Sequence, residues 1–246
     1  VLDLSLIVEL KSVQQDRTSL RIGAGVALSE LRGYIEQDFP ALATTLDVFG
    51  SLQIRNLATL GGNLGSASPI GDALSALIPH RARIVLQNVE RTREVPLDEF
   101  VIGYRTTVRR PDELITAVLL PRPEPDALIK WYKVSKRRDL DISTLSAGFR
   151  LTLDAHGTVN DVVLAYGGMA EKVQRASHTE RFLLGRRWSR ELVEQAMEVI
   201  DGDFTPISDA RGTADFRRVA ARNLLLRFWS DAQQSLDGRN RERATA

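Results

Sequence analysis

The chain has 246 residues, of which 43% are hydrophobic and 26% are charged, a composition typical of a globular protein with one large or two small domains. Its 33 basic and 32 acidic residues leave a net charge of +1, too little to attract nucleic acid or an anionic membrane, and no run of 18 apolar residues predicts a membrane span. Cysteine is absent and the three histidines stand apart, which excludes disulfides, thiolate metal sites and cysteine-bound iron–sulfur clusters.

The first part of the chain is expected to combine strands with short helices. Alternation of apolar and polar residues predicts a strand over 18–26. Apolar residues at helical spacing predict a helix over 28–39, which Pro40 is expected to end. Another helix is predicted over 72–78, with Asp72 as a candidate N-cap. Further strands are predicted over 82–86, 93–97 and 113–120.

A proline-rich segment separates this part from the rest. Residues 121–127, PRPEPDA, carry three of the nine prolines and predict a stiff extended linker. Three strands are predicted after it, over 130–135, 143–153 and 159–166. Three helices are predicted next, over 179–184, 189–200 and 215–230. The expected class is α+β, with one domain over 1–124, a second over 128–236 and a frayed tail over 237–246.

The segment 58–72, ATLGGNLGSASPIGD, is the most informative part of the sequence. Its paired glycines would let backbone N–H groups approach an anion, and its serine, threonine and asparagine side chains add polar donors. The segment matches neither the Rossmann fingerprint nor a Walker loop. It is therefore interpreted either as a polar cradle for a pyrophosphate or as a long turn that uses its glycines for steric reasons alone.

Five motifs in order resemble one family. FGSLQIRNLATLGGNLGSASPIGD, GYRTT, DELITAVLLP, KVSKRRDLDIS and YGGMA are similar to the flavin part of the molybdenum hydroxylases, the xanthine dehydrogenase family, and above all to its bacterial small subunits. The resemblance implies a mixed-sheet lobe of a PCMH-type FAD-binding domain. A CO dehydrogenase flavoprotein-like C-terminal domain would follow, with a three-stranded antiparallel sheet on a three-helix bundle.

The resemblance also implies a set of cofactor-binding residues. Phe49 and Ile115 would pack on opposite sides of a flat part of FAD, although Phe49 would otherwise be an ordinary core residue. Asp72 would accept a hydrogen bond from a cofactor hydroxyl, in addition to or instead of capping its helix. Lys133 would lie at the flavin, whereas its basic neighbours form a solvated edge. The full implied set is Phe49, Ala58, Thr59, Gly61, Gly62, Asn63, Ser68, Asp72, Ile115, Lys133 and Asp141.

The function implied is electron relay by non-covalently bound FAD. Electrons from the oxidation of a purine such as xanthine or hypoxanthine would pass from 2Fe-2S clusters through FAD to NAD, with no catalytic acid or base in this chain. Molybdopterin and the clusters would lie in a molybdopterin-binding large subunit and an iron–sulfur domain, within a dimer of heteromeric protomers in the cytoplasm. The alternatives are the flavin subunit of another molybdenum hydroxylase, of the carbon monoxide dehydrogenase or aldehyde oxidase kind, and a flavin-free assembly subunit.

Two departures from the family bear on these expectations. Family members carry a loop of the GGTDxG kind upstream of the segment that corresponds to VLDLSLIVEL, and FAD affinity is expected to depend on it. Pro79 and His80 replace the small residues that usually follow the Asp72 helix, and the sequence gives no interpretation of this change.

Overall fold

A computed structural model describes residues 3–245, the last seven as helical backbone only. The N-terminal part, up to residue 123, contains a five-stranded sheet in the order β1-β2-β7-β3-β4. Its strands are β1 (Val13–Gln15), β2 (Ser19–Gly23), β3 (Arg83–Gln87), β4 (Thr92–Pro96) and β7 (Leu114–Pro121). The α+β class is confirmed, but every strand pair of this sheet is antiparallel rather than mixed.

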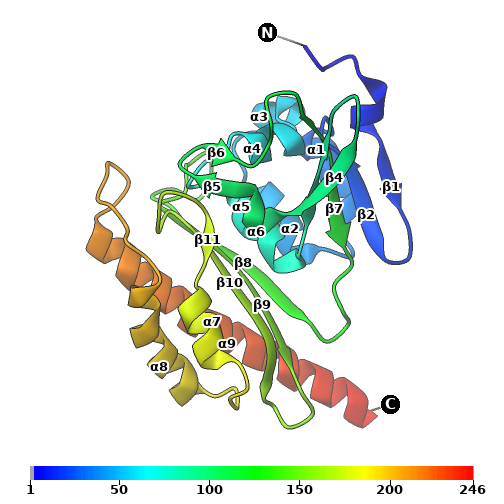
Figure 1. Cartoon of the computed structure of the whole chain (residues 1–246). Coiled ribbons are helices and arrows are strands. Elements are labelled where there is room, and N and C mark those ends of the chain that lie inside the picture. The colour runs from blue at the N-terminus through cyan, green and yellow to red at the C-terminus, as the bar shows by residue number, and fades with distance from the viewer. Residues whose placement is uncertain (1–2, 246) are drawn as a thin grey trace.

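Helices cover one side of this sheet and fill the connections between its strands (Figure 1). They are α1 (Leu28–Ile35), α2 (Pro40–Asp47), α3 (Leu52–Leu57), α4 (Leu60–Gly65), α5 (Asp72–Leu77), the 3₁₀ turn η2 (Ile78–His80) and α6 (Leu97–Phe100). A further 3₁₀ turn, η1 (Val8–Lys11), precedes the sheet, and the small hairpin of β5 (Val101–Gly103) and β6 (Thr106–Thr107) follows α6.

Two expectations about these helices were wrong. Helix α1 ends at Ile35, and Pro40 begins α2 instead of only ending its predecessor. Proline suits the first position of a helix, where the missing N–H would have no partner within the helix. The segment 58–72 is also not a long turn throughout, because α4 lies within it, and α3 directly precedes it. Ser51 and Thr59 cap these helices, each accepting a hydrogen bond from the backbone N–H three residues on.

The C-terminal part is a sheet packed on helices, as expected. The sheet order is β11-β10-β9-β8, and all pairs are antiparallel. Its long strands are β8 (Leu128–Val134), β9 (Leu145–Leu153) and β10 (Val159–Gly167), and the two-residue β11 (Gln174–Arg175) adds a short fourth strand. The helices are α7 (Ser177–Leu183), α8 (Arg190–Val199), the turn η3 (Ile200–Gly202) and α9 (Ala214–Thr245). Helix α9 reaches Thr245 and so runs through the range 237–245 of the expected frayed tail, while residue 246 lies outside the described range.

The β8–β10 sheet lies between two hydrophobic cores. In Figure 1, helix α9 crosses the sheet on the side away from the N-terminal part. On β10, Val163 and Ala165 belong to the core shared with the N-terminal part, whereas Leu164 and Tyr166 belong to the core under the helices. Neighbouring side chains of a strand point to opposite faces, so one strand contributes to both cores.

Helix α5 packs directly on this sheet. A Cβ placed on Gly148 of β9 would lie 1.9 Å from the backbone oxygen of Ser75, so only glycine allows the helix to approach so closely. A hydrogen-bond cluster surrounds the contact: Ser75 Oγ lies 2.9 Å from Ser146 Oγ and accepts from Trp131 Nε1 at 3.0 Å. The junction between the two parts of the chain is therefore tightly packed.

Candidate functional site

A cavity of about 330 Å³, here called the Asp72 cavity, lies where the glycine-rich segment meets the C-terminal part. The N-terminal part contributes residues around α3, α4 and the start of α5, and the C-terminal part contributes β8 and the loop after it. Six of the predicted site residues line this cavity: Phe49, Asn63, Ser68, Asp72, Lys133 and Asp141. The fold thus brings together residues up to 92 positions apart in the sequence, as Phe49 and Asp141 are.

A buried ion pair forms one wall of the Asp72 cavity. Lys133 Nζ lies 3.0 Å from Asp72 Oδ2, and the two side chains are only 7% and 8% exposed. Lys133 also donates to the backbone oxygen of Val48 at 3.3 Å, and Ser143 Oγ donates to Asp72 Oδ1 at 2.6 Å. Such a pair is stable away from water because each charge has a partner and additional hydrogen bonds.

This geometry decides the alternative that the sequence left open for Asp72, and it shows the surroundings of Lys133. Asp72 does not cap its helix: Gly71 is the N-cap residue, no side chain caps the helix, and Asp72 is the first helical residue. Its carboxylate is instead held by groups of the C-terminal part. Lys133 does not belong to a solvated edge, since it is buried and paired. The ion pair has no net charge, so Lys133 does not present a free cation to a ligand.

Asn63 and Ser68 contribute polar groups from α4 and the turn after it. The side-chain oxygen of Asn63 is buried and has no hydrogen-bond partner among the described residues. Ser68 Oγ accepts a weak hydrogen bond from the N–H of Ile70 at 3.4 Å and can still donate its proton. A buried oxygen without a partner is costly in a protein interior, so the Asn63 amide is suited to receive a donor from a bound molecule.

Asp141 reaches the cavity from the loop between β8 and β9. Its Oδ2 accepts from the N–H of Arg137 at 2.9 Å and its Oδ1 from its neighbour Ile142 at 3.0 Å. These backbone hydrogen bonds, the bond from Arg137 first, lower the pKa of the Asp141 carboxyl, which also lies beside the Arg137 charge. Asp141 therefore closes a turn within the loop as well as lining the cavity.

The remaining predicted residues lie mostly at a second cavity of about 670 Å³, here called the Ile115 cavity. Thr59, Gly61, Gly62 and Ile115 line it. Phe49 and Ile115, expected on two sides of one flat ring, thus line different cavities. Ala58 lines neither of the two, and its backbone is used within the fold: its N–H donates to Ile54 and its oxygen accepts from Leu28.

The backbone amides at the start of α4 already have partners. The N–H groups of Leu60 and Gly61 donate to Val26 and Ala24, and that of Gly62 donates to Thr59 Oγ1 at 3.1 Å. The expected cradle of free amides is therefore not formed by these three groups. Gly61 has a steric reason to be glycine, because a Cβ there would lie 2.5 Å from the Cβ of Ala24. At Gly62 the only close neighbour of a Cβ would be Thr59 Oγ1 at 3.0 Å.

Two functional candidates were missed by sequence reasoning. Ser143 is one, since nothing in the sequence indicates that its hydroxyl meets Asp72. The other is Glu113, a buried residue of the Ile115 cavity that binds Arg93 through two hydrogen bonds of 2.7 and 2.9 Å. The Arg93 guanidinium holds the pKa of the Glu113 carboxyl well below its usual range.

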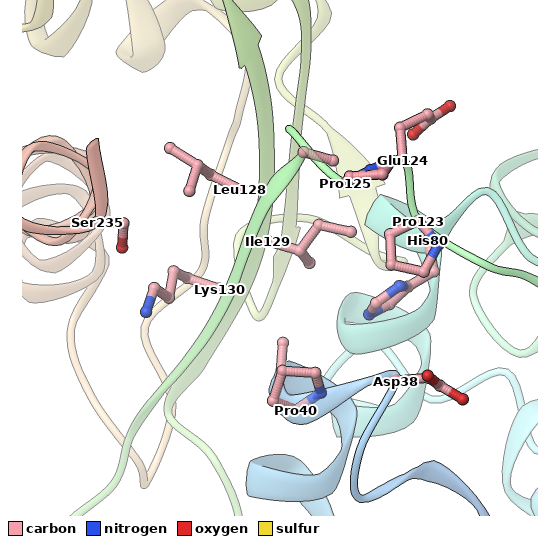
Figure 2. A pocket seen from close by; sticks show the side chains of 12 residues that line it. Asp38, Pro40, His80, Pro123, Glu124, Pro125, Leu128, Ile129, Lys130 and Ser235 are labelled. Carbon is pink, nitrogen blue, oxygen red and sulfur yellow. The ribbon is translucent and has the colours of Figure 1, made fainter. Parts of the chain in front are cut away.

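A third cavity, of about 410 Å³, lies under the linker and contains none of the predicted site residues (Figure 2). The ring of His80 lies there beside Pro123 and across from Ile129. Both ring nitrogens are buried without a partner among residues 3–238, whose side chains are described. Burial, with the nearby charge of Arg150, lowers the pKa of His80 to about 3. Pro79 and His80, which the sequence left uninterpreted, therefore fill the junction between the two parts of the chain.

Within the described part of the chain, no group of three or more histidine, aspartate or glutamate side chains is arranged to hold a metal ion. Over the same residues, no helix has both the length and the apolar character needed to cross a bilayer.

The comparisons with known proteins cover both parts of the chain. Residues 1–123 match the family model for the FAD binding domain in molybdopterin dehydrogenase, and residues 130–232 match the CO dehydrogenase flavoprotein C-terminal domain. The xanthine dehydrogenase/oxidase of Gallus gallus is 35% identical over 94% of the chain, and the nicotinate hydroxylase hnxS of Emericella nidulans is 33% identical over 92%. In both cases the chain spans 18% of the relative's length.

Solved structures extend this likeness to the fold. A chain of carbon monoxide dehydrogenase from Hydrogenophaga pseudoflava superposes with a TM-score of 0.84 at 25% identity, over 90% of this chain and 77% of the other. Quinoline 2-oxidoreductase from Pseudomonas putida 86 also gives 0.84, at 23% identity, over 95% and 81%. The chain therefore belongs to the family of FAD-binding domains of molybdopterin dehydrogenases, the molybdenum hydroxylases that include the xanthine dehydrogenases.

Proposed function

We propose that this chain binds FAD without a covalent bond and serves as the flavin part of a xanthine dehydrogenase-type molybdenum hydroxylase. The observation that carries the proposal is the Asp72 cavity, where Asn63 offers a buried oxygen without a partner beside a fixed carboxylate and an aromatic ring. These groups fit the cofactor's hydroxyl and amide donors and its flat ring. No cysteine exists in the chain to form a thioether link to the flavin.

Five residues of the Asp72 cavity have a proposed part in holding FAD. Phe49 supplies an aromatic face for a flat part of the cofactor. Asp72 accepts a hydrogen bond from a cofactor hydroxyl, and Asn63 accepts from a second donor, while Ser68 donates. Lys133 keeps the Asp72 carboxylate in place. Ile115, Thr59 and Gly62 would contact another portion of the cofactor in the Ile115 cavity, whereas Gly61 and Ala58 support the surrounding backbone.

FAD, when bound, links one-electron donors to a two-electron acceptor. We propose that 2Fe-2S clusters supply the electrons and that NAD receives them, and that a molybdopterin-binding part of the assembly oxidises a purine. The similarity to xanthine dehydrogenases supports this proposal. The matches to the two family models also support a domain boundary near residues 125–127. The nicotinate hydroxylase among the relatives favours a second candidate, in which the same flavin part serves a different substrate.

Titration with FAD tests the binding site. The wild-type chain is expected to quench flavin fluorescence to saturation at one FAD per chain. Asp72→Asn removes the charge while keeping the size of the side chain, and should raise the FAD dissociation constant at least about tenfold, since hydrogen bonds to charged groups are among the strong ones. Asp47→Asn is the matched control, because Asp47 pairs with Arg32 on the surface and lines neither cavity.

The outcomes separate the parts of the proposal. A chain that takes up no FAD, either alone or joined to the family's upstream loop, would contradict the flavin function and favour an assembly role. Equal affinities of wild type, Asp72→Asn and Asp47→Asn would place FAD elsewhere. Anaerobic addition of NADH to the FAD-loaded chain tests the acceptor, because reverse hydride transfer bleaches the flavin absorbance. Persistent yellow colour with NADH, together with bleaching by dithionite, would argue against NAD.

A further inference from the structure

We infer that Ser143 is a positioning residue, which fixes the carboxylate of Asp72 in the orientation that receives a hydroxyl group of the bound cofactor. The inference rests on the proposed function, since it concerns the same cavity. Ser143 Oγ donates to Asp72 Oδ1 at 2.6 Å, the shortest contact of the carboxylate, and both residues are buried. The two residues are 71 positions apart and come from different parts of the chain.

Lys133 alone does not fix the orientation of the Asp72 carboxylate, and a second donor is needed for this. Lys133 holds only Oδ2, and its ammonium sits at the end of a flexible stem. One donor to one oxygen leaves the carboxylate free to rotate about its bond to Cβ. A second donor on the other oxygen fixes the plane of the group. A carboxylate offers about four lone-pair sites, so the two that remain can accept from a ligand in the cavity.

The backbone of Ser143 is well suited to hold this orientation. The next residue, Thr144, donates its N–H to Val134 at 2.8 Å, and its oxygen accepts from the buried guanidinium of Arg217. Arg217 also donates to the backbone oxygen of Gly168 at 2.8 Å and binds Asp209. Ser143 thus stands where the exposed loop that carries Leu140 and Ile142 joins a rigid strand.

The alternative role for Ser143 is a simple link between the two parts of the chain. The junction contains a matched hydroxyl with only that role: Ser146 is equally buried, pairs with Ser75 Oγ at 2.9 Å, and does not line the Asp72 cavity. Both roles predict that removal of the hydroxyl lowers stability. Only the positioning role predicts a specific loss of cofactor affinity that depends on the Asp72 carboxylate.

The test compares FAD dissociation constants of Ser143→Ala, Ser146→Ala, Asp72→Asn and the double variant Ser143→Ala/Asp72→Asn. All three single substitutions are close in size to the native residues, and urea midpoints check that each protein is folded. Ser143→Ala is expected to raise the dissociation constant about tenfold, the value of one hydrogen bond to a charged group. Ser146→Ala should stay within about twofold of wild type. In the Asp72→Asn background, Ser143→Ala should have a clearly smaller effect than in wild type, because the charged carboxylate that it positions has been replaced by a neutral amide.

Several results would overturn the inference. An unchanged dissociation constant in Ser143→Ala would show that Lys133 alone suffices to orient Asp72. Equal losses in Ser143→Ala and Ser146→Ala would mark both as general supports of the junction. A loss on Ser143→Ala that is as large in the Asp72→Asn background as in wild type would mean that Ser143 acts independently of the carboxylate. These outcomes leave the proposed function standing, whereas a wild-type chain that binds no FAD even when joined to the family's upstream loop would overturn both.

Discussion

At the scale of single residues, His80 should make folding sensitive to acid. Its pKa is lowered to about 3 in the folded protein, against an ordinary value of about 6.5, so below pH 6.5 the unfolded chain binds a proton that the folded chain does not. Stability from this group is fully present above pH 6.5 and is lost as the pH falls toward 3. The loss approaches about 1.4 kcal/mol for each pH unit within that window.

Urea unfolding between pH 7 and pH 4.5 measures this effect. The difference between wild type and His80→Phe removes the contributions of all carboxylates that the two proteins share. The free energy of unfolding of wild type should fall more steeply with acid than that of His80→Phe, and His80→Gln should follow the shallower curve because it also lacks the titrating ring. Parallel curves for all three proteins would mean that His80 is protonated as easily in the folded chain as in the unfolded one.

Gly168 gives a second prediction at this scale. It adopts a φ of +84°, and a Cβ there would lie 2.5 Å from the oxygen of Thr144, beside Arg217. Gly157 in the β9–β10 turn has a similar φ of +78° but open space around it. Gly157→Ala should therefore cost only the backbone strain, about 1 kcal/mol, and Gly168→Ala about 3 kcal/mol or more. Chemical denaturation of both variants measures the difference, and equal costs would show that the YGGMA motif needs glycine for its backbone angle alone.

The candidate site shows how far residue types alone can lead. The motifs identified residues that line the Asp72 and Ile115 cavities, because the sequence gives the type of every side chain directly. The partners of Asp72 could not be found, since Lys133 and Ser143 reach it only when β8 and β9 pack against α5. Contacts between distant segments depend on the tertiary fold, and no local pattern near Ser143 encodes them. For the same reason, the sequence could not show that the backbone N–H groups of Leu60, Gly61 and Gly62 already have hydrogen-bond acceptors, which include the backbone oxygens of Ala24 and Val26.

At the scale of elements, helices and strands were predicted correctly where the apolar residues of a segment repeat with one clear helical or strand period. The strands β9 and β10 and helix α8 were predicted within about two residues of their observed bounds. The short helices α2, α3 and α4 were missed because each is a turn or two long and has no extended period. Their caps were visible, but Ser51 and Thr59 in a glycine-rich context also suit a ligand loop. A local rule such as proline at a helix boundary does not say which side of the boundary is helical.

Helices α3 and α4 should respond differently to the loss of their caps. Replacing either cap residue with alanine removes a hydrogen bond worth about 1 kcal/mol to its helix. Helix α4 buries Leu60 and Leu64, so Thr59→Ala should lower the global free energy of unfolding by about that amount. Helix α3 buries no residue, so it can open without disturbing the core, and Ser51→Ala should mainly speed hydrogen exchange of its own amides. Equal global losses would show that α3 is part of the cooperative core.

At the scale of the whole molecule, the β8–β10 sheet ties the two parts of the chain together. Trp131 packs in the core shared with the N-terminal part, while its neighbour Tyr132 packs under the helices. Across the junction, Asp161 of β10 binds both Arg150 of β9 and Arg81 of the N-terminal part, at 2.8 and 2.7 Å. The sequence predicted two domains from the linker, but it could not show that one sheet serves two cores, because that depends on which face of each strand meets which partner.

This arrangement predicts that the chain unfolds in a single transition. Neither core can lose its packing without exposing one face of the shared strands, and separate unfolding of the N-terminal part would uncover Trp131, Val163 and Ala165 together.

Two variants test the prediction by placing one fluorescent reporter in each core. Trp188→Phe/Trp229→Phe retains Trp131, and Trp131→Phe/Trp229→Phe retains Trp188 under the helices. In each variant, urea midpoints from fluorescence and from far-ultraviolet circular dichroism should coincide. If the Trp131 signal changes at a lower urea concentration than the circular dichroism, the N-terminal part unfolds first and the shared sheet does not couple the two cores. The result also bears on the site, because the Asp72 cavity takes its residues from both parts and exists only while they remain packed together.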